Sequence, residues 1–356
     1  MKVLLFSKYS RKGASSRLRS LQYIPSLELY DMQITVSSLF SDAYLNGFYG
    51  NNRKSFFFVF LAYLRRLVAL IGVFKYDVIW IEKEIFPYIP SLAERMLKLI
   101  GKPYIVDYDD AIFHNYDSSS YFLVRLLLGT NIDSVMRNSS CVIAGNQYLA
   151  DRAIAAGASK VQIIPTVVDH ARYAQRSHQP GEPLVIGWIG SPSTQKYVLA
   201  IKGPLVSACQ SYGAVLRLVG ATSELAAEFP DTQVDILPWS EDTETELIRQ
   251  MDVGIMPLPN GPWEKGKCGY KLIQYMACAV PVIASPVGVN LRIVTETGSG
   301  LLAISESEWK RSLTALLDSS MLRLQMGQAG RSAVENFFSL QQQSAKLARI
   351  LKESAL

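Results

Sequence analysis

The stretch PLPNGPWEKGKCGYKLIQYMACAVPVIASPVGVN, residues 257–290, decides how the second half of the chain folds. It follows an apolar run, Val253–Pro257, that is typical of a buried strand, and it opens with a loop rich in Gly, Pro and Lys. Apolar residues then recur at helical spacing and predict a helix that begins near Gly269. These residues are Leu272, Ile273, Met276 and Ala277. Because another apolar run, Pro281–Ala284, comes next, the stretch predicts strand, loop, helix and strand of a parallel sheet.

The rest of the chain repeats this alternation of apolar runs and helix-like segments. Strands are predicted in the first half at Val3–Ser7, Gln33–Ser37, Val78–Glu82, Tyr104–Asp107, Cys141–Ala144 and Val161–Pro165. In the second half they are predicted at Leu184–Ile189, Val215–Val219, Val234–Leu237, Val253–Pro257, Pro281–Ala284 and Gly300–Ala303, with helices near 195–211, 243–251, 269–279 and 305–318. We therefore expect an α/β protein whose parallel sheets are covered by helices on both faces.

The chain has 356 residues, more than one core usually holds, and a polar stretch with Pro180 and Gly181 separates the two series of strands. We predict a Rossmann-like N-terminal domain over 1–170, a linker over 171–182, and a second Rossmann-like domain over 183–335. A C-terminal helix over 336–356 can pack back on the first domain. Two doubly wound domains in series predict a ligand cleft between the carboxyl ends of their sheets.

Composition limits the classes of function. The chain has 36 Lys and Arg against 31 Asp and Glu, a net charge of +5. This mild excess suits an anionic substrate or a membrane surface, and without a basic tail or an RNA-binding motif we expect no nucleic-acid partner. The four cysteines form no CxxC pair and only three histidines are present, so we expect a cytoplasmic protein without a metal site. The first ten residues hold an apolar run too short for a signal sequence.

Residues 53–75, RKSFFFVFLAYLRRLVALIGVFK, bear on localisation. Arg65 and Arg66 separate two apolar blocks, neither of which reaches the ~20 residues of a spanning helix. Two interpretations stay open. The first is a helix buried beneath the sheet. The second is an interfacial helix, peripheral on the inner face of the cell membrane, with cations facing lipid phosphates; these cations are Lys54, Arg65, Arg66 and Lys75.

The loop and helix within residues 257–290 suit a diphosphate. Lys267, Lys271 and Gln274 stand at i, i+4 and i+7, so we expect them to share one helix face. A helix amino terminus offers N–H groups and partial positive charge, and the two lysines add cationic donors. Gln274, one turn further, is placed to hydrogen-bond a ribose hydroxyl. The alternative is a solvated polar helix face.

A second candidate loop lies in LVIGWIGSPSTQKY, residues 184–197. Gly190 and Ser191 follow a predicted strand and allow the backbone to approach phosphate oxygens closely. Lys196 is a further candidate cation for the same ligand. The two loops together predict a phosphate site in the second domain.

These residues resemble a known family. QYMACAVPVIAS, then VGVN and GSGLLA, are similar to the donor-binding motif of retaining family-4 glycosyltransferases, which have the GT-B fold. The resemblance implies two Rossmann-like doubly wound parallel-sheet domains facing a central cleft. It also implies that Lys271 binds the donor phosphates and that Gln274 takes the ribose position. Pro238 and Trp239 fall in the region of the base, with a buried turn as the alternative.

Two positions depart from that family, which carries a glutamate, seven residues and a second glutamate before the helix. Here Gln274 replaces the second glutamate, and the first falls at about Gly266. Glu264 and Lys267 lie beside that position and are the candidates for contact with the donor sugar. A glutamine still accepts a hydrogen bond from a hydroxyl, but without charge assistance.

Residues 104–117, YIVDYDDAIFHNYD, place polar groups at the end of a predicted strand. Asp107 and Asp109 form a DxD pattern, which binds a metal in another glycosyltransferase class; we discount it because the phosphate-binding features lie in the other half. The stretch resembles an acceptor-side segment of the same family. His114 is a candidate to bind the sugar or orient the acceptor, and Asp110 to assist acceptor activation. The alternatives are a structural histidine and a capping aspartate.

The stretch KYSRKGASSRLRS, residues 8–20, ends the first predicted strand and opens a helix. It is not GxGxxG, which argues against a nicotinamide dehydrogenase. Family members use this loop near the reacting centre, so the resemblance places Gly13, Ala14 and Arg17 on the acceptor side.

The resemblance implies a retaining transferase for cell-surface polysaccharide or glycolipid assembly. Its donor would be a nucleotide-sugar, for example of UDP or GDP, and its acceptor a glycan or a lipid-linked hydroxyl. We expect no cofactor and no metal, because fixed cations take the metal's role. Two alternatives stay open: a sugar-nucleotide epimerase of the same fold, and a degenerate protein that binds sugar-nucleotides without turnover.

Overall fold

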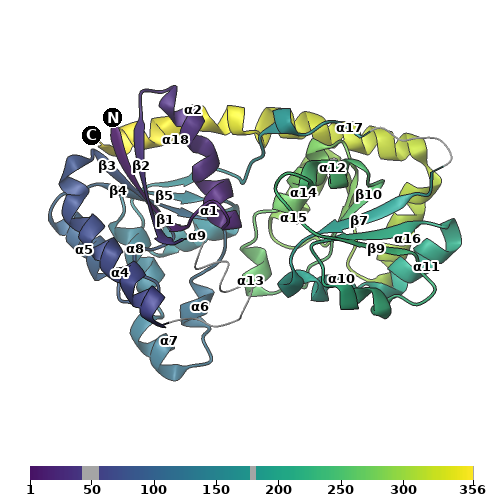
Figure 1. Ribbon diagram of the computed structural model, residues 1–356, viewed down its shortest axis with the longest axis horizontal. Helices are drawn as coiled ribbons and strands as arrows, with labels where there is room; N and C mark the ends of the chain where they lie inside the picture. Colours follow the sequence, from purple (N-terminus) through teal and green to yellow (C-terminus); the bar gives the residue numbers. More distant parts are fainter. Residues whose placement is uncertain (42–55, 177–181, 356) are drawn as a thin grey trace. The chain divides into compact units, whose positions relative to one another are not determined.

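The computed structural model describes residues 1–41, 56–176 and 182–355. They form two compact units, each with its own sheet (Figure 1). Unit 1 consists of Met1–Thr166, Gly266–Cys268 and Leu340–Leu356, and unit 2 of Val167–Lys265 and Gly269–Ser339. The predicted linker, 171–182, begins inside unit 2, because Tyr173 is buried in that core and Arg176 pairs with Asp252; residues 177–181 lie outside the described part.

Unit 1 contains a six-stranded parallel sheet of order β2-β1-β3-β4-β5-β6. Its strands are β1 (Lys2–Tyr9), β2 (Gln33–Phe40), β3 (Val78–Glu82), β4 (Tyr104–Tyr108), β5 (Cys141–Ala144) and β6 (Val161–Ile163). Its helices are α1 (Ala14–Arg19), α2 (Ile24–Glu28), α4 (Phe56–Ile71), α5 (Leu92–Leu99), α6 (His114–Asp117), α7 (Phe122–Leu128), α8 (Asn131–Asn138), α9 (Gln147–Ala155) and α18 (Leu340–Ala355), with 3-10 turns η1 (Leu21–Tyr23) and η2 (Gly72–Lys75).

Unit 2 contains a second six-stranded parallel sheet, of order β12-β11-β10-β7-β8-β9. Its strands are β7 (Val185–Ile189), β8 (Val215–Val219), β9 (Val234–Leu237), β10 (Val253–Met256), β11 (Val282–Ala284) and β12 (Gly300–Leu302). Its helices are α10 (Lys196–Leu199), α11 (Lys202–Tyr212), α12 (Glu244–Arg249), α13 (Pro262–Lys265), α14 (Tyr270–Ala277), α15 (Val289–Thr297), α16 (Glu306–Asp318) and α17 (Ser320–Phe337), with 3-10 turns η3 (His170–Arg172), η4 (Pro192–Thr194) and η5 (Ser223–Glu228).

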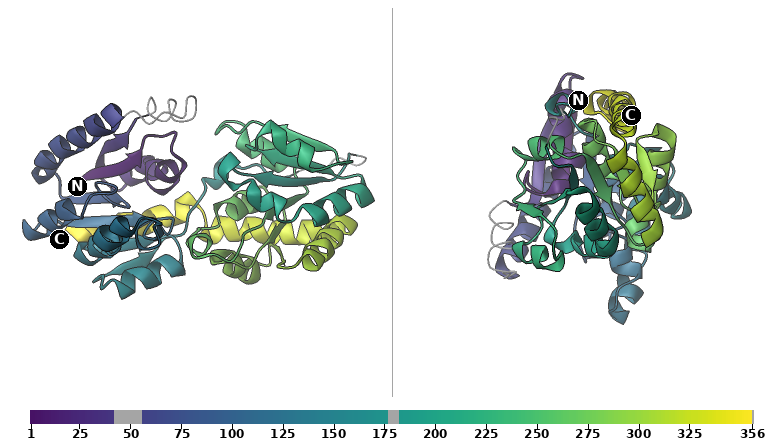
Figure 2. Two further views of the ribbon diagram at one scale, coloured as in Figure 1. Left: turned by 90° about the horizontal axis from the view of Figure 1, so that it is seen from below. Right: turned by 90° about the vertical axis from the view of Figure 1, so that its right-hand side faces the viewer.

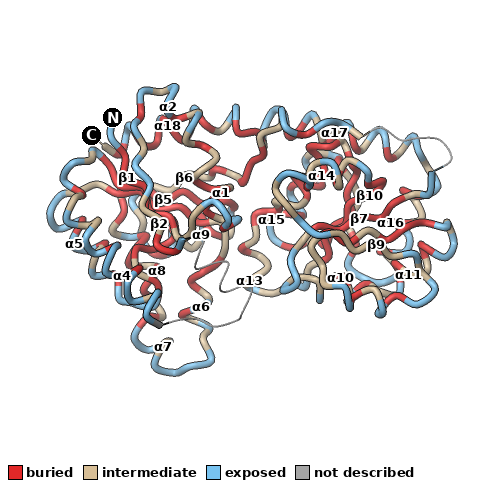
Figure 3. Tube along the Cα trace, in the orientation of Figure 1, coloured by how far each residue is buried: buried red, intermediate tan, exposed pale blue. Residues whose placement is uncertain are grey.

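Each predicted strand is a strand of the structure, so the predicted α/β class with two doubly wound sheets is confirmed. The central strands of each sheet are buried (Figure 3), and Figure 2 shows helices on both faces of each sheet. A parallel sheet covered in this way buries both faces of its strands, which explains their continuous apolar runs. Helices α13, α15 and α17 were not predicted.

Helix α4 forms within residues 53–75, for which a buried helix and an interfacial helix were the two interpretations. Only 17% of the stretch Phe57–Lys75 is buried, so the interpretation as a helix buried beneath the sheet is wrong, although its length and composition would allow it to cross a membrane. Arg66 does not face outward as expected: its side chain is buried and donates to the carbonyl oxygens of Ser7 and Ser37 at 2.6 and 3.0 Å. Arg65 and Lys75 are exposed, and Lys54 lies outside the described residues.

A buried ion pair joins α1 to β4 at the edge of the unit 1 core. Arg19 donates from Nε and Nη2 to the two carboxylate oxygens of Asp107 at 2.8 and 3.2 Å, and from Nη1 to the carbonyl oxygen of Ile164 at 2.9 Å. Both side chains are at most 5% exposed. Burial raises the pKa of Asp107 to about 6 although Arg19 opposes the shift. The pair therefore stabilises unit 1 only while both partners are present.

We expect Arg19→Met to lower the free energy of unfolding by roughly 3–5 kcal/mol, because it leaves the Asp107 carboxylate buried and unpaired. The double variant Arg19→Met/Asp107→Leu removes both charges and should recover most of that loss. Urea unfolding of the full chain, followed by circular dichroism, measures both values. Equal stability of the single and double variants would contradict this account of the pair.

Candidate functional site

A glycine follows each of the strands β7 and β8 in unit 2: Gly190 after β7 and Gly220 after β8. The N–H of Gly190 donates to the carbonyl oxygen of Val219 at 3.0 Å, and Gly220 has a φ of +79°. A Cβ at Gly220 would lie 2.3 Å from the oxygen of Gly190 and 3.2 Å from the Cβ of Trp239. Glycine is therefore required at position 220, where a side chain would collide with the backbone of Gly190.

Lys271 places a cation beside this backbone. It lies in the first turn of α14, whose N-cap is Gly269, and its Nζ is 4.6 Å from the centroid of the Trp188 ring. The same Nζ is 2.9 Å from the point where a Cβ of Gly190 would stand. An ammonium, glycine backbone and the amino end of a helix together form a suitable site for a phosphate group.

A chain of hydrogen bonds connects two of the predicted donor residues. The Gln274 amide donates to the Tyr173 hydroxyl at 3.5 Å, and that hydroxyl donates to Glu244 Oε1 at 3.1 Å. The Trp239 indole donates to Glu244 Oε2 at 2.8 Å. Gln274 and Glu244 are buried, whereas Trp239 is 38% exposed and presents a ring to solvent. Tyr173 and Glu244 were not predicted as site residues from the sequence, because no local pattern records the hydrogen bonds that place them here.

Two other predicted donor residues, Ser191 and Lys196, lie in the segment that follows β7. Ser191 caps the turn η4 through a capping box with Thr194. Lys196 is exposed on α10, with its Nζ 5.4 Å from the centroid of the Tyr197 ring. The Tyr197 hydroxyl donates to Glu264 Oε1 at 2.6 Å. This hydrogen bond fixes the Glu264 carboxylate against α10, the helix that carries Lys196.

The expectation that Lys267 shares a helix face with Lys271 and Gln274 is wrong. Helix α14 begins at Tyr270, and Lys267 lies in a segment, Gly266–Cys268, that belongs to unit 1. Asn146 fixes that segment by donating to the carbonyl oxygens of Gly266 and Lys267 at 2.9 and 3.0 Å. The Lys267 ammonium lies 3.8 Å from Asp110 Oδ1.

In unit 1, acidic and basic side chains gather where β3 and β4 end. The Lys83 ammonium lies 2.9 Å from Asp109 Oδ1 and 3.9 Å from Asp110 Oδ2, and it donates to Ser15 Oγ at 2.9 Å. Burial raises the pKa of Asp109, but the charge of Lys83 and the hydrogen bonds from Ser15 and Lys83 lower it, so that the pKa of Asp109 is about 2. Burial and the charge of Asp109 raise the pKa of Asp110, against Lys83 and Lys267. Asp110 is therefore the more basic of the two carboxylates.

The three residues predicted for the acceptor-side loop, Gly13, Ala14 and Arg17, have different environments. Ala14 is exposed at the start of α1, and Gly13 packs against Tyr9. Arg17 is buried and donates to the carbonyl oxygen of Arg11 at 3.3 Å, so its guanidinium holds the loop. Ser15, which the sequence analysis did not single out, donates to Asp109.

His114 begins α6 and has protein partners at both ring nitrogens. Nδ1 lies 2.9 Å from Asp117 Oδ1, and Nε2 lies 2.9 Å from the Tyr148 hydroxyl. The ring also stands edge-on to Phe113, with centroids 4.5 Å apart. These contacts fix the orientation of the imidazole, and a ligand would have to replace one of them to hydrogen-bond the ring.

The two aspartates of the DxD pattern have cationic partners. Asp107 is bound by Arg19, and Asp109 by Lys83. Over residues 1–41, 56–176 and 182–355, no group of three or more His, Cys, Asp or Glu side chains is placed to hold a metal ion.

Glu84 is a buried carboxyl next to this edge. It is 8% exposed, and the Tyr116 hydroxyl donates to its Oε1 at 2.6 Å. Burial raises the pKa of Glu84 to about 7, against the hydrogen bond from Tyr116, and the neighbouring Glu94 adds to the rise. The carboxyl therefore titrates near neutral pH.

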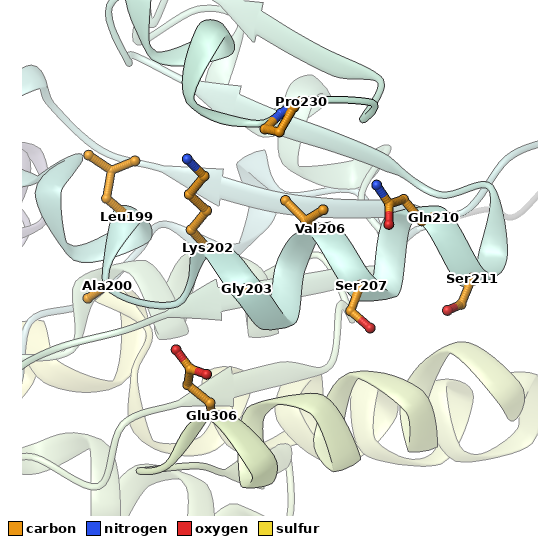
Figure 4. Close-up of a pocket in the computed structure, with 10 residues that line it drawn as sticks. All are labelled: Leu199, Ala200, Lys202, Gly203, Val206, Ser207, Gln210, Ser211, Pro230 and Glu306. Carbon is orange, nitrogen blue, oxygen red and sulfur yellow. The ribbon is translucent and has the colours of Figure 1, made fainter.

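A shallow pocket of about 480 Å³ lies elsewhere on unit 2, over α11 (Figure 4). Lys202, Val206 and Gln210 point to one side of that helix, and Ser207 and Ser211 to the other. None of the predicted site residues lines it.

Comparisons with known proteins bear on the family and the fold. Residues 183–319, most of them in unit 2, match the family described as "Glycosyl transferases group 1". No curated protein sequence matches the chain. Among solved structures, sucrose-phosphate synthase (tll1590) from Thermosynechococcus elongatus is similar, with 13% identity, a TM-score of 0.73, and coverage of 99% of this chain and 98% of that one.

Two further structures are similar over their whole length. Anabaena Alr3699/HepE in complex with UDP-glucose has 15% identity and a TM-score of 0.71, with 99% of this chain and 100% of that one covered. WaaG, described as a glycosyltransferase involved in lipopolysaccharide biosynthesis, has 14% identity and a TM-score of 0.67, with 99% of each chain covered. The fold is therefore GT-B, as predicted, and the family match supports a GT-B glycosyltransferase.

Glu84 gives a prediction about pH. Its folded pKa of about 7 lies above the ordinary value of 4.5, so its contribution to stability is complete below pH 4.5 and is lost as the pH rises through 7. Ionisation of the Glu84 carboxyl should lower the free energy of unfolding by on the order of 3 kcal/mol. Glu84→Gln keeps the acceptor for Tyr116 and cannot ionise, so it should raise the melting temperature relative to wild type at pH 8 but not at pH 4. A pH-independent difference would contradict the assignment.

Proposed function

We propose that this chain transfers a sugar from a nucleotide-diphosphate donor to a hydroxyl acceptor. The observation that carries the proposal is the position of the Lys271 ammonium beside Gly190, in the region that matches a glycosyltransferase family. Lys271 and the N–H groups at the start of α14 bind the diphosphate and offset the negative charge that develops on it as the leaving group departs. The exposed ring of Trp239 supplies a face on which the base can stack.

The chemistry proposed is that of the retaining family-4 enzymes, so the anomeric configuration is kept. The support is the similarity of QYMACAVPVIAS, 274–285, to their donor motif. The first glutamate would fall at about Gly266, where a Cβ would lie 2.4 Å from the Cβ of Ala111, so this structure leaves no room for a side chain there. Gln274 binds the ribose as a neutral group, oriented by Tyr173 and Glu244. Glu264 is the carboxylate proposed for the donor sugar.

On the acceptor side, Asp110 is proposed to accept the proton of the attacking hydroxyl, with His114 positioning the acceptor. The raised pKa of Asp110 suits a base better than that of Asp109, which Lys83 holds low. The acceptor proposed is a glycan or a lipid-linked sugar of a surface polysaccharide or glycolipid. WaaG acts in lipopolysaccharide biosynthesis, which makes this acceptor class the first to test.

The protein is proposed to work in the cytoplasm, peripherally on the inner face of the membrane. Helix α4 supports this location, since Phe57, Phe58 and Phe60 are each more than half exposed. No metal is proposed for the transfer, because Lys271 and the helix N–H groups supply positive charge at the diphosphate. UDP-glucose is the first donor to test, since HepE was solved with it.

We expect Lys271→Ala to weaken UDP binding at least roughly tenfold, since a charge-assisted hydrogen bond contributes about 1.5–3 kcal/mol. Uridine, which lacks phosphates, should lose little. Isothermal titration measures both ligands, with Lys202→Ala on the outer face of α11 as the matched control. An equal loss for UDP and uridine, in a variant that stays folded, would argue against phosphate binding.

Transfer from the donor should continue after dialysis against EDTA, because protein cations take the role of a metal. The rate of UDP release with a sugar acceptor, measured with EDTA and with added Mg²⁺ or Mn²⁺, tests this. A rate that falls with EDTA and returns with Mn²⁺ would overturn the metal-independent proposal. Donor binding without transfer to any acceptor would favour the degenerate binding protein.

A further inference from the structure

An apolar groove of about 660 Å³ lies between α4 and α5 of unit 1. Helix α4 contributes Leu64, Leu67 and Ile71 to its walls, and α5 contributes Leu92 and Met96. These five side chains are 47–75% exposed. Figure 3 shows α4 and α5 with long exposed stretches. A folded protein rarely leaves so large an apolar surface in water unless another apolar phase covers it.

The groove reaches the loop that follows β3. Phe86 and Ile89 line it, and they lie three and six residues after Lys83 in that loop. The Tyr63 hydroxyl of α4 donates to the carbonyl oxygen of Pro87 at 2.6 Å and fixes this loop against the helix. Whatever occupies the groove therefore lies next to the loop that carries Lys83.

Helix α4 is fixed to the sheet and cannot cross a bilayer in this fold. Arg66 is buried against β1 and β2, with its guanidinium 4.6 Å from the centroid of the Phe6 ring. Crossing the membrane would remove these partners and place the charge in hydrocarbon. The helix is therefore held along the surface of unit 1 with its other faces outward.

The charges of this surface have one sign. Between Phe57 and Lys75 there is no acidic residue, and between Leu92 and Ile100 the only one is Glu94, which is buried. The exposed charged side chains on α4, η2 and α5 are Arg65, Lys75, Arg95 and Lys98. A second copy of the chain on this face would bring like charges together, which opposes a symmetric dimer.

We propose that this surface docks on an anionic phospholipid bilayer, with lipid hydrocarbon chains in the α4–α5 groove and the cations among the headgroups. An apolar face combined with cations binds shallowly at such an interface. Long Lys and Arg side chains reach headgroups while their stems lie along apolar surface. The inference deepens the proposed function, on which its role rests: a bilayer held beside the Lys83 loop presents an acceptor anchored in the same membrane.

Sedimentation with vesicles tests the proposal on the full chain. We expect binding to vesicles of phosphatidylcholine with phosphatidylglycerol, weaker binding to phosphatidylcholine alone, and release from the mixed vesicles by salt. Protein that stays in the supernatant with both kinds of vesicle overturns the proposal. A concentration-dependent dimer in sedimentation equilibrium that Leu67→Asp/Ile71→Asp abolishes would assign the surface to a second copy instead.

Two double variants locate the contact. Leu67→Asp/Ile71→Asp changes the groove, and Lys75→Glu/Lys98→Glu changes the cations; each should weaken binding to the anionic vesicles roughly tenfold or more. Leu29→Asp, at an 84% exposed position away from the groove, and Lys310→Glu/Lys352→Glu are the matched controls and should bind like wild type. Variants that bind as tightly as wild type would show that the surface is not the docking site.

The same samples separate this inference from the proposed function. UDP-glucose should raise the melting temperature of wild type and of both double variants equally, because none of the changed residues lies at the donor site. Failure of vesicle binding with a normal thermal shift refutes only the membrane surface. Vesicle binding without any shift by nucleotide-sugars refutes only the donor site.

Discussion

Both candidate sites depend on strands that run parallel within each sheet. In a parallel sheet every strand ends at the same edge, so the loops that follow the strands meet there. The edge of unit 2 collects Gly190, Gly220 and Trp239 from the ends of β7, β8 and β9. The edge of unit 1 collects Lys83 and Asp109 from the ends of β3 and β4. Residues far apart in sequence become neighbours because the strands are in register, and helices on both faces keep them so.

The strands could be predicted because burial on both faces leaves a direct record in the sequence. The run Cys141–Ala144 is continuous and apolar, and its bounds in the structure are the predicted ones. Gly190 and Lys271 were also recognisable, because a glycine after a strand and a lysine in the first turn of a helix are local patterns. Their proximity, with Nζ beside Gly190, required only that β7 and β10 be neighbours.

Other features depended on contacts that no local pattern records. Lys267 has helical spacing to Lys271, yet Asn146, more than a hundred residues earlier, fixes its segment in unit 1. Arg66 sits in an apolar run that looks lipid-facing, but two strand carbonyls accept its hydrogen bonds. Glu244 orients Trp239 from a helix with no motif of its own. Each position is decided by a distant partner, and sequence spacing carries no information about that partner.

The two edges differ in charge in a way that fits the two ligands of the proposed transfer. At the edge of unit 2, the Lys271 ammonium lies beside Gly190 and in the first turn of α14, which suits the diphosphate of the proposed donor. At the edge of unit 1, Lys83 and Lys267 lie near Asp109 and Asp110, so two cations largely offset two carboxylates. The proposed acceptor is a neutral hydroxyl, which needs a carboxylate that can accept its proton. Pairing Lys83 closely with Asp109 keeps that carboxylate ionised and its pKa low, while the more distant Asp110 retains a raised pKa and the greater basicity.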